Sequence, residues 1–326
     1  MNKNIEKLGK LIKKSEKILL INHIRMDPDA FGSLGAFYYI LKKLGKNVKA
    51  TNDFLPPENF SFLESSDIIE PGINISVFNP DLIISFDAAS IGQLGETYIN
   101  YEKIFKEKDF VVIDHHMTNN GFGSINIIDD KYSSTCELAF DIIEKLKLDK
   151  YITKKIATLL TAGIHTDTNI FYNQNTSSHT LRIAAKLMDF GADFRSTMYN
   201  FFQKSSWEKT KLFGLVFDKM QKSEGGKIIW VNINKKDFEK TKTGDEDTSG
   251  IINRLINIEG CEIAFLLYEL GDEVKTSFRS KEFNVGDFCA DFGGGGHMLA
   301  AGFRSKKNMI EIEKEILDKL QKRIKV

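Results

Sequence analysis

The first half of the chain alternates short strand-like runs with longer segments whose apolar residues recur at helical spacing. The strand-like runs are 17–23, 47–51, 81–87 and 109–115. The helical patterns are 31–46, 133–148, 153–167 and 177–192. Strands that alternate with helices favour a parallel sheet with helices on both faces. We therefore predict an α/β domain with a parallel sheet in this half.

The second half repeats the alternation on a smaller scale. Strands are predicted at 227–233, 261–270 and 273–281, and Gly271-Asp272 between the last two is typical of a hairpin turn. A charged amphipathic helix ends the chain. The predicted domains are a parallel-sheet domain at 1–190, a helical linker at 191–210 and a smaller α/β domain at 211–326.

Length, charge and cysteine content indicate the number of domains, the kind of binding partner and the redox compartment. A chain of 326 residues favours two domains. Lys+Arg and Asp+Glu both total 45, which argues against a basic protein that coats nucleic acid but allows a local basic pocket. Three widely separated cysteines without a CxxC pair are typical of buried thiols in a reducing compartment.

The N-terminal pattern and the lengths of the apolar runs indicate in which cellular compartment the protein is expected. Residues 4–17 have the pattern of an amphipathic helix and lack the apolar core of a signal peptide. No apolar run approaches the ~18 residues that a membrane span needs. We therefore expect a cytoplasmic protein without a membrane segment. Its oligomeric state stays open, with a homodimer among the alternatives.

Acidic and imidazole side chains follow three of the predicted strands. The first strand leads to His23, and the third ends at Asp87. Because ligands of open α/β sheets bind beyond the carboxyl ends of the strands, these side chains are predicted to share one crevice. The full candidate set also draws on the turn after 17–23, the fourth strand and the helix 153–167: His23, Asp27, Asp29, Asp87, Asp114, His115, His116, His165 and Asp167.

Each of these residues alone has an ordinary structural explanation. A strand-end aspartate often caps a helix or forms a turn, and Pro28 makes Asp27 a turn residue. A single His165 is typical of a structural histidine. Together, however, four or five carboxylates and two or three imidazoles would repel one another without cations. Mixed Asp/His ligands suit manganese, iron or zinc, and two-metal sites commonly catalyse displacement at phosphorus.

A run of four glycines, 293–296, precedes His297 near the C-terminus. Glycines let backbone N–H groups approach a phosphate or a base closely, although such runs are more often flexible loops. A helix predicted to begin near His297 would present its N-terminus to an anion.

Several motifs resemble those of the DHH phosphoesterase superfamily, which includes the RecJ exonucleases and the family II inorganic pyrophosphatases. HIRMDPDAFGS, FDAAS, DHH and GIHTDT occur in the order of its four motifs. RSKEFNV and FGGGGHMLAAG resemble the DHH-associated C-terminal domain. Length and layout are most similar to the bacterial bifunctional oligoribonuclease/pAp phosphatases, also called nanoRNases.

The resemblance implies two divalent metal ions, expected to be manganese. It implies His23, Asp27 and Asp87 on one ion, with Asp87 bridging to the other. The second ion is expected on Asp29, Asp87, His115 and Asp167. His116 would hold or protonate the leaving oxygen, and Asp114 would orient an imidazole.

The resemblance also implies a phosphate-binding set in the second domain: Arg279, Ser280, Gly293, Gly294, Gly295, Gly296 and His297. Without the resemblance, Arg279 would be a solvent-facing strand residue. The implied substrates are RNA fragments of a few nucleotides, released as mononucleotides, and pAp, cleaved to AMP and phosphate.

Four other functions compete with this one. A c-di-AMP or pApA phosphodiesterase shares the motifs. Length and neutral charge disfavour a RecJ-like single-strand exonuclease. The glycine-rich motif disfavours an inorganic pyrophosphatase, and the complete ligand set disfavours a non-catalytic nucleotide sensor.

Overall fold

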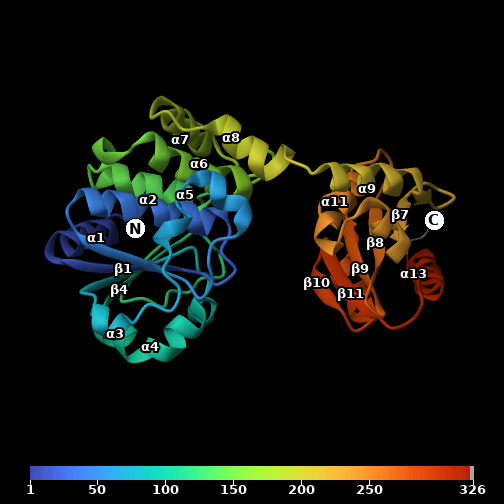
Figure 1. Ribbon diagram of the computed structural model, residues 1–326, viewed down its shortest axis with the longest axis horizontal. Helices are drawn as coiled ribbons and strands as arrows, with labels where there is room; N and C mark the ends of the chain where they lie inside the picture. Colours follow the sequence, from blue (N-terminus) through green and yellow to red (C-terminus); the bar gives the residue numbers. More distant parts are fainter. Residues whose placement is uncertain (324–326) are drawn as a thin grey trace. The chain divides into compact units, whose positions relative to one another are not determined.

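A computed structural model describes residues 1–323, with Ser66 described in its backbone alone. The chain divides into two compact units, Met1–Lys204 and the residues from Ser205 onward (Figure 1). Residues 191–204, which the sequence assigned to a linker, belong to the first unit. They form α8 (Phe194–Met198) and a π-helical turn at Tyr199–Gln203. The ring of Phe201 packs there at 5.8 and 5.0 Å from the rings of Phe60 and Phe62, which explains the difference.

The first unit is built on a parallel sheet, which confirms the predicted α/β class. Within the described residues the sheet has five strands in the order β2-β1-β3-β4-β5. The edge strand β5, which follows the Thr118-Asn119-Asn120-Gly121 turn (the TNNG turn), was not predicted. The strand bounds are β1 (Lys17–Asn22), β2 (Asn47–Thr51), β3 (Leu82–Phe86), β4 (Asp109–Asp114) and β5 (Ile125–Ile128).

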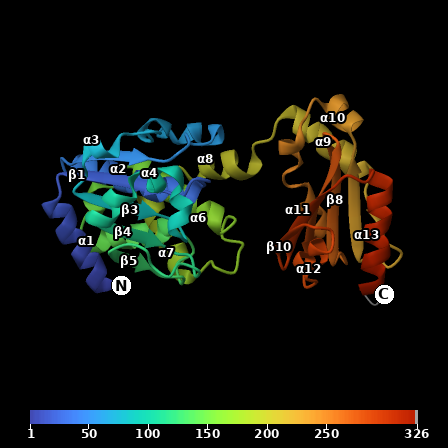
Figure 2. The ribbon, with the colours of Figure 1, turned by 90° about the horizontal axis from the view of Figure 1, so that it is seen from below.

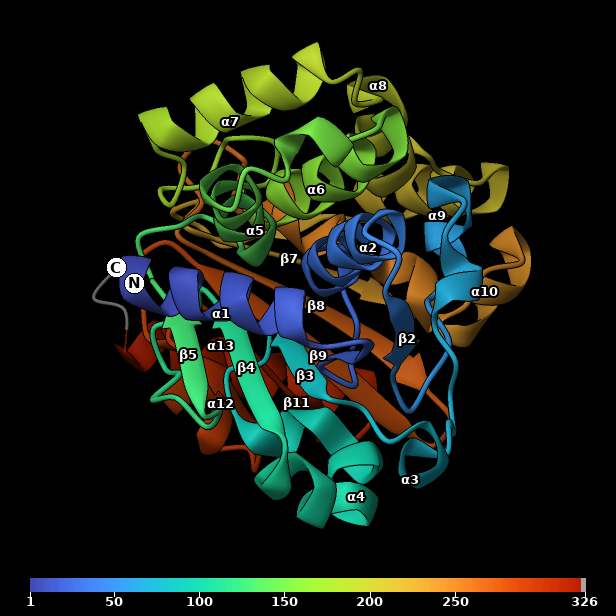
Figure 3. The same cartoon turned by 90° about the vertical axis from the view of Figure 1, so that its left-hand side faces the viewer.

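Helices cover both faces of this sheet (Figure 3). Successive side chains of a strand point to opposite faces, so Leu20 joins one apolar core and Leu19 the other. The larger core contains side chains of α1 (Asn2–Lys14), α2 (Pro28–Lys43), α5 (Thr135–Lys145), α6 (Lys154–Asp167) and α7 (Ser178–Asp189). The smaller core contains α3 (Ile75–Phe78) and α4 (Gly95–Glu107).

Capping side chains set where the helices of the first unit begin. Asp27 caps α2, with Pro28 as the first helical residue. Ser134 caps α5 by accepting the N–H of Glu137. A serine followed three residues later by a glutamate is the pattern of a capping box, but the box forms only in part, because the carboxylate of the buried Glu137 accepts the N–H of Ser133 and not that of Ser134.

Helices α2 and α6 approach each other closely through two glycines. A Cβ atom on Gly32 would lie 2.3 Å from the carbonyl oxygen of Leu159. A Cβ atom on Gly163 would lie 2.4 Å from Asp29 Oδ1 and 2.4 Å from Cys136 Sγ. The absence of side chains at these positions therefore brings Asp29, near the start of α2, against α6.

The second unit is a mixed sheet with the strand order β10-β11-β9-β8-β7-β6 in its described part (Figure 2). Strands β7 and β8 pair in parallel, and β8 and β9 form the predicted antiparallel hairpin. The bounds are β6 (Gln221–Lys222), β7 (Ile228–Ile233), β8 (Ile263–Leu270), β9 (Glu273–Ser280), β10 (Gly295–His297) and β11 (Ala300–Ser305).

Two helical layers cover the second sheet. Side chains of α9 (Trp207–Asp218) and α11 (Ile251–Ile256) share a core with Val231 of β7, and α10 (Lys235–Thr241) lies near them. Side chains of α12 (Val285–Ala290) and α13 (Met309–Arg323) share the other core with Phe265 of β8.

The prediction that a helix begins near His297 is wrong. Residues 295–297 form β10, which pairs antiparallel with β11. A Cβ atom on Gly294 would lie 2.3 Å from the carbonyl oxygen of Gly302. A Cβ atom on Gly296, whose φ is 148°, would lie 2.6 Å from the carbonyl oxygen of Ala300. The glycines thus permit close strand pairing and do not precede a helix.

Two further predictions concern the whole chain. Among the helices of residues 1–323, none combines the length and apolarity needed to cross a membrane. Cys136, Cys261 and Cys289 are buried free thiols, as the sequence predicted.

The crossing of α2 and α6 generates a stability prediction. We expect Gly32→Ala to lower the free energy of unfolding by ~1–3 kcal/mol, because the added methyl group meets backbone that must shift. Gly92→Ala is the matched control in the same unit, since a Cβ there meets no atom within 4 Å. It should change stability by less than about 0.5 kcal/mol. Equal denaturant midpoints and slopes for both variants would contradict the close crossing.

Candidate metal centre

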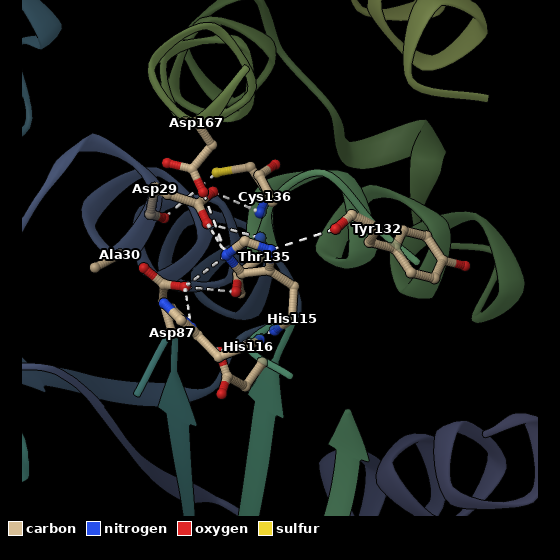
Figure 4. A network of polar contacts seen from close by, with 12 residues as sticks. Asp29, Ala30, Asp87, His115, His116, Tyr132, Thr135, Cys136 and Asp167 are labelled. Carbon is tan, nitrogen blue, oxygen red and sulfur yellow. Dashed lines mark hydrogen bonds and ion pairs between the residues drawn. The ribbon is translucent and has the colours of Figure 1, made fainter. Parts of the chain in front are cut away.

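Acidic and imidazole side chains converge beyond the carboxyl ends of the parallel strands in the first unit (Figure 4). His23 follows β1, Asp87 follows β3, and His115 follows β4. Helix α2 contributes Asp29 near its start and helix α6 contributes Asp167 at its end. Parallel strands place their carboxyl ends along one edge, so sequence-distant side chains meet there.

The converging side chains form three overlapping groups, each with ligand atoms within 4.8 Å of one another. Asp87 belongs to two groups and His115 belongs to two. The groups are His23, Asp27 and Asp87; Asp29, His115 and Asp167; and Asp87, His115 and His116. Predicted ligands from four separate chain segments are thus brought together, and Asp87 is shared by the first and third groups.

The separations within these groups suit a shared cation. His115 Nε2 lies 3.2 Å from Asp167 Oδ2 and 3.7 Å from Asp87 Oδ1. His23 Nε2 lies 3.6 Å from Asp87 Oδ2 and 3.7 Å from Asp27 Oδ1. Two ligands at ~2.1 Å from one cation are roughly 3.0–3.5 Å apart. The His115–Asp167 pair already has this spacing, and the other three pairs, at 3.6 to 3.7 Å, are slightly wider. The donor set and its spacing therefore fit divalent transition-metal ions.

Asp87 has an unusual backbone. Its φ of 56° is left-handed, a conformation that residues other than glycine adopt rarely. Its N–H donates to the carbonyl of Ile113 at 3.0 Å, and its Oδ1 accepts a hydrogen bond from Thr135 Oγ1 at 2.8 Å. Strained backbone of this kind persists when surrounding contacts enforce it, often at functional sites.

Asp29 is completely buried and is held by the first turn of α5. Its Oδ2 accepts the N–H of Thr135 at 2.6 Å, and its Oδ1 accepts the N–H of Cys136 at 2.8 Å. Burial, followed by the charges of Asp167 and Asp87, nevertheless raises the pKa of Asp29 well above its usual range. A bound cation would favour the ionised carboxylate that ligation requires.

The crowding of charges also shifts the pKa values of the imidazoles and of Asp167. Burial lowers the pKa of His115, but the hydrogen bond to Asp167 and the charges of Asp29 and Asp87 outweigh it and raise that pKa to about 10. Burial also lowers the pKa of His23, but hydrogen bonds to Asp27 and Asp87 and their charges outweigh it and raise that pKa to about 9. Burial raises the pKa of Asp167 to about 6. Without metal, the imidazoles therefore carry protons that partly neutralise the carboxylates.

The adjacent histidines have different partners. His116 Nδ1 lies 2.7 Å from Asp114 Oδ1, whereas His115 Nδ1 faces the carbonyl oxygen of Tyr132 at 3.3 Å. The hydrogen bond to Asp114 raises the pKa of His116. Asn119 Nδ2 donates to the other oxygen of Asp114 at 2.7 Å, so the buried carboxylate is fixed from two sides.

Sequence reasoning missed some supporting residues, and it placed His165 among the crevice candidates while interpreting that residue alone as structural. Asn119 lies in the TNNG turn, and Thr135 follows the cap of α5; the turn and cap signals mark their backbone but not their contacts. His165 does not join the cluster. Its Nδ1 lies 2.9 Å from Thr197 Oγ1, its ring packs on Phe194, and burial lowers its pKa to about 4, so it is a structural histidine.

The second unit has a shallow pocket of about 490 Å³ over β9, β10 and β11. Arg279, Gly295, Gly296 and His297 line it, together with Lys275 and Ser277 and neighbouring backbone. Arg279 lies on the more exposed face of β9, and burial lowers the pKa of its guanidinium.

Three predicted members of the phosphate-binding set do not line this pocket. Ser280 points into the other face of β9, where its hydroxyl donates to the carbonyl of Phe283. Gly293 and Gly294 form the turn that leads into β10.

Two family models match the chain. Residues 17–164 match the DHH family, N-terminal domain, and residues 225–326 match the DHHA1 domain. A Bacillus subtilis (strain 168) protein named bifunctional oligoribonuclease and PAP phosphatase NrnA is 30% identical over 291 residues, which are 88% of this chain and 88% of the relative.

Solved structures share the fold. An exopolyphosphatase-related protein from Bacteroides fragilis superposes with a TM-score of 0.84 at 23% identity, covering 100% of this chain and 98% of the other. RecJ from Thermus thermophilus in complex with Mn²⁺ has a TM-score of 0.52 at 13% identity, covering 99% of this chain and 55% of RecJ.

The protonated imidazoles generate a prediction about metal binding. We expect Mn²⁺ binding to the chelator-treated protein at pH 7 to release protons, because His23 and His115 must become neutral to ligate. Calorimetric titrations in two buffers of different ionisation enthalpy measure this release. It should diminish towards pH 10, since the two pKa values of about 9 and about 10 leave the imidazoles increasingly neutral there. Heats that do not depend on the buffer at pH 7 would contradict the charge assignment.

Proposed function

Because the chain belongs to the DHH family, we propose that it is a phosphoesterase that hydrolyses short oligoribonucleotides to mononucleotides and pAp to AMP and phosphate. The observation that carries the proposal is the convergence of His23, Asp27, Asp29, Asp87, His115 and Asp167 at one sheet edge. The printed name of the B. subtilis relative supports both substrates.

The proposed cofactors are two divalent cations, with manganese favoured by the mixed imidazole and carboxylate ligands. When bound, such ions activate water and neutralise the charge of the phosphate under attack. His23 and Asp27 would hold one ion, and Asp29, His115 and Asp167 the other. Asp87 is proposed as the shared ligand, because its two oxygens face different histidines.

His116 is proposed to donate a proton to the leaving oxygen. Asp114 holds its Nδ1, which leaves Nε2 as the atom that can face a substrate. The raised pKa favours the protonated imidazole, in which Nε2 carries a proton that can be transferred. Asn119 would act through Asp114 by fixing the orientation of this carboxylate.

The pocket of the second unit is proposed to bind a substrate phosphate. Arg279 offers a planar set of N–H donors that matches phosphate oxygens. His297 is exposed beside it, and the backbone of Gly295 and Gly296 is open to a ligand. The pocket replaces the predicted helix N-terminus as the source of phosphate contacts.

Loss of the shared ligand tests the metal assignment. We expect Asp87→Ala to abolish turnover of pAp, because it removes contacts to both ions at once. Asp114→Asn should cost less, roughly 10–100-fold in kcat, as losses of residues that orient metal-site ligands typically do. The exposed Asp189→Asn is the matched control and should keep full activity. A folded Asp87→Ala protein with near-normal rates would reject the shared role.

Substrate length tests the role of the second unit. RNAs of two to five nucleotides should be degraded faster per molecule than a 20–25-mer, because contacts end after a few nucleotides and a neutral chain attracts a long backbone weakly. Arg279→Ala and His297→Ala should weaken this preference and leave metal content unchanged. The measurement is kcat/KM over a length series for all three proteins.

Other outcomes of the length series would favour the competing functions. Rates that climb steadily with length would favour a RecJ-like exonuclease. No turnover of any RNA, with strong turnover of pApA or c-di-AMP, would favour a cyclic-dinucleotide phosphodiesterase.

A further inference from the structure

An exposed aromatic side chain follows closely on one of the candidate metal ligands. Tyr172, five residues after Asp167, is 80% exposed. It lies in the loop between α6 and α7, which extends from the body of the first unit (Figure 2). Single exposed apolar side chains are common on protein surfaces and need no explanation by themselves. The backbone that carries Tyr172 is the feature that sets it apart.

Three consecutive non-glycine residues before Tyr172 are left-handed. Asn169, Ile170 and Phe171 have φ values of 48°, 55° and 64°. Asparagine tolerates this conformation, but a β-branched residue such as Ile170 is an outlier there. Backbone of this kind is strained, so the surrounding contacts must enforce the conformation.

Those contacts tie the strained turn to helix α6. The N–H of Ile170 donates to the carbonyl of His165 at 2.8 Å, and the N–H of Phe171 donates to Thr168 Oγ1 at 2.9 Å. The ring of Phe171 packs edge-on against the buried ring of His165 at 5.3 Å. His165, which is not a metal ligand in this arrangement, thus anchors the turn.

The residues after Tyr172 tie the loop to the candidate metal centre itself. Asn173 Nδ2 donates to the carbonyl of Asp167 at 3.0 Å, and Asn175 Nδ2 lies 3.3 Å from the same oxygen. Asn175 Nδ2 also donates to the carbonyl of Ser133, close to α5. Tyr172 is therefore held between a strained turn and two asparagines that contact the backbone of Asp167.

We propose that Tyr172 is a nucleobase-stacking residue of the first unit, which binds the base next to the phosphate under attack. The inference rests on the proposed function and adds a specificity-determining residue to it. A phenol ring can stack on any base, since every base presents a π-face, and this suits a substrate class of mixed sequence. The strained turn and its hydrogen bonds to α6 hold the backbone that carries the exposed ring.

The test compares a substrate that has a base with one that lacks it. Wild-type protein and variants are assayed on pAp and on the base-free analogue 1-deoxyribose 3,5-bisphosphate. Tyr172→Ala should lower kcat/KM for pAp by roughly 5- to 100-fold and leave the base-free substrate unchanged. Tyr172→Phe keeps the ring and should keep the activity. Ile99→Ala, which removes a side chain with 65% exposure from α4, is the matched control.

A binding measurement separates failure of this inference from failure of the proposed function. A 2-aminopurine analogue of pAp should lose fluorescence on binding to the manganese-loaded wild type, and less so with Tyr172→Ala. Equal losses of kcat/KM on both substrates, or equal quenching by both proteins, would overturn the stacking role. Absence of wild-type turnover on pAp and RNA, with Tyr172-dependent quenching, would reject the proposed reaction and keep the stacking site.

Discussion

The first unit depends on holding several carboxylates together in a buried crevice. Asp29, Asp87 and Asp167 lie near one imidazole, and Asp29 has no contact with solvent. Like charges in such a site repel unless protons or cations compensate them. The surrounding structure supplies fixed partial charges for the same purpose, since the N–H groups at the start of α5 face Asp29. A strong preference for bound cations follows from this arrangement.

The sequence predicted those site residues whose positions follow from the topology of the sheet. Alternating strands and helices indicate a parallel sheet, and a parallel sheet aligns the residues that follow its strands. His23, Asp87 and His115 could therefore be grouped before their distances were known. The supporting contacts could not, because the left-handed backbone of Asp87 and its bond from Thr135 arise only when distant segments meet.

The glycine run shows where the local pattern was misread, whereas the interpretation of His165 as a structural histidine agrees with its buried contacts. His165 precedes Asp167 by two positions, about 200° around a helix, so the two side chains face nearly opposite directions. That geometry was available from the sequence. The strand at 295–297 was not, because glycines lack the alternating pattern of a half-buried strand. Its pairing is set by β11, which itself pairs with β9 across the intervening helix α12.

The buried thiol of Cys136 can report local opening at the close crossing of α2 and α6. The thiol lies behind Asp29, with Sγ 3.4 Å from the carbonyl oxygen of that residue. Burial, followed by the charge of Asp29, raises the pKa of this thiol well above its usual range, so it is almost never a reactive thiolate. An alkylating reagent can reach it only when α2, α5 and α6 separate. The labelling rate of this cysteine therefore measures how often these three helices come apart, with no need for an introduced probe.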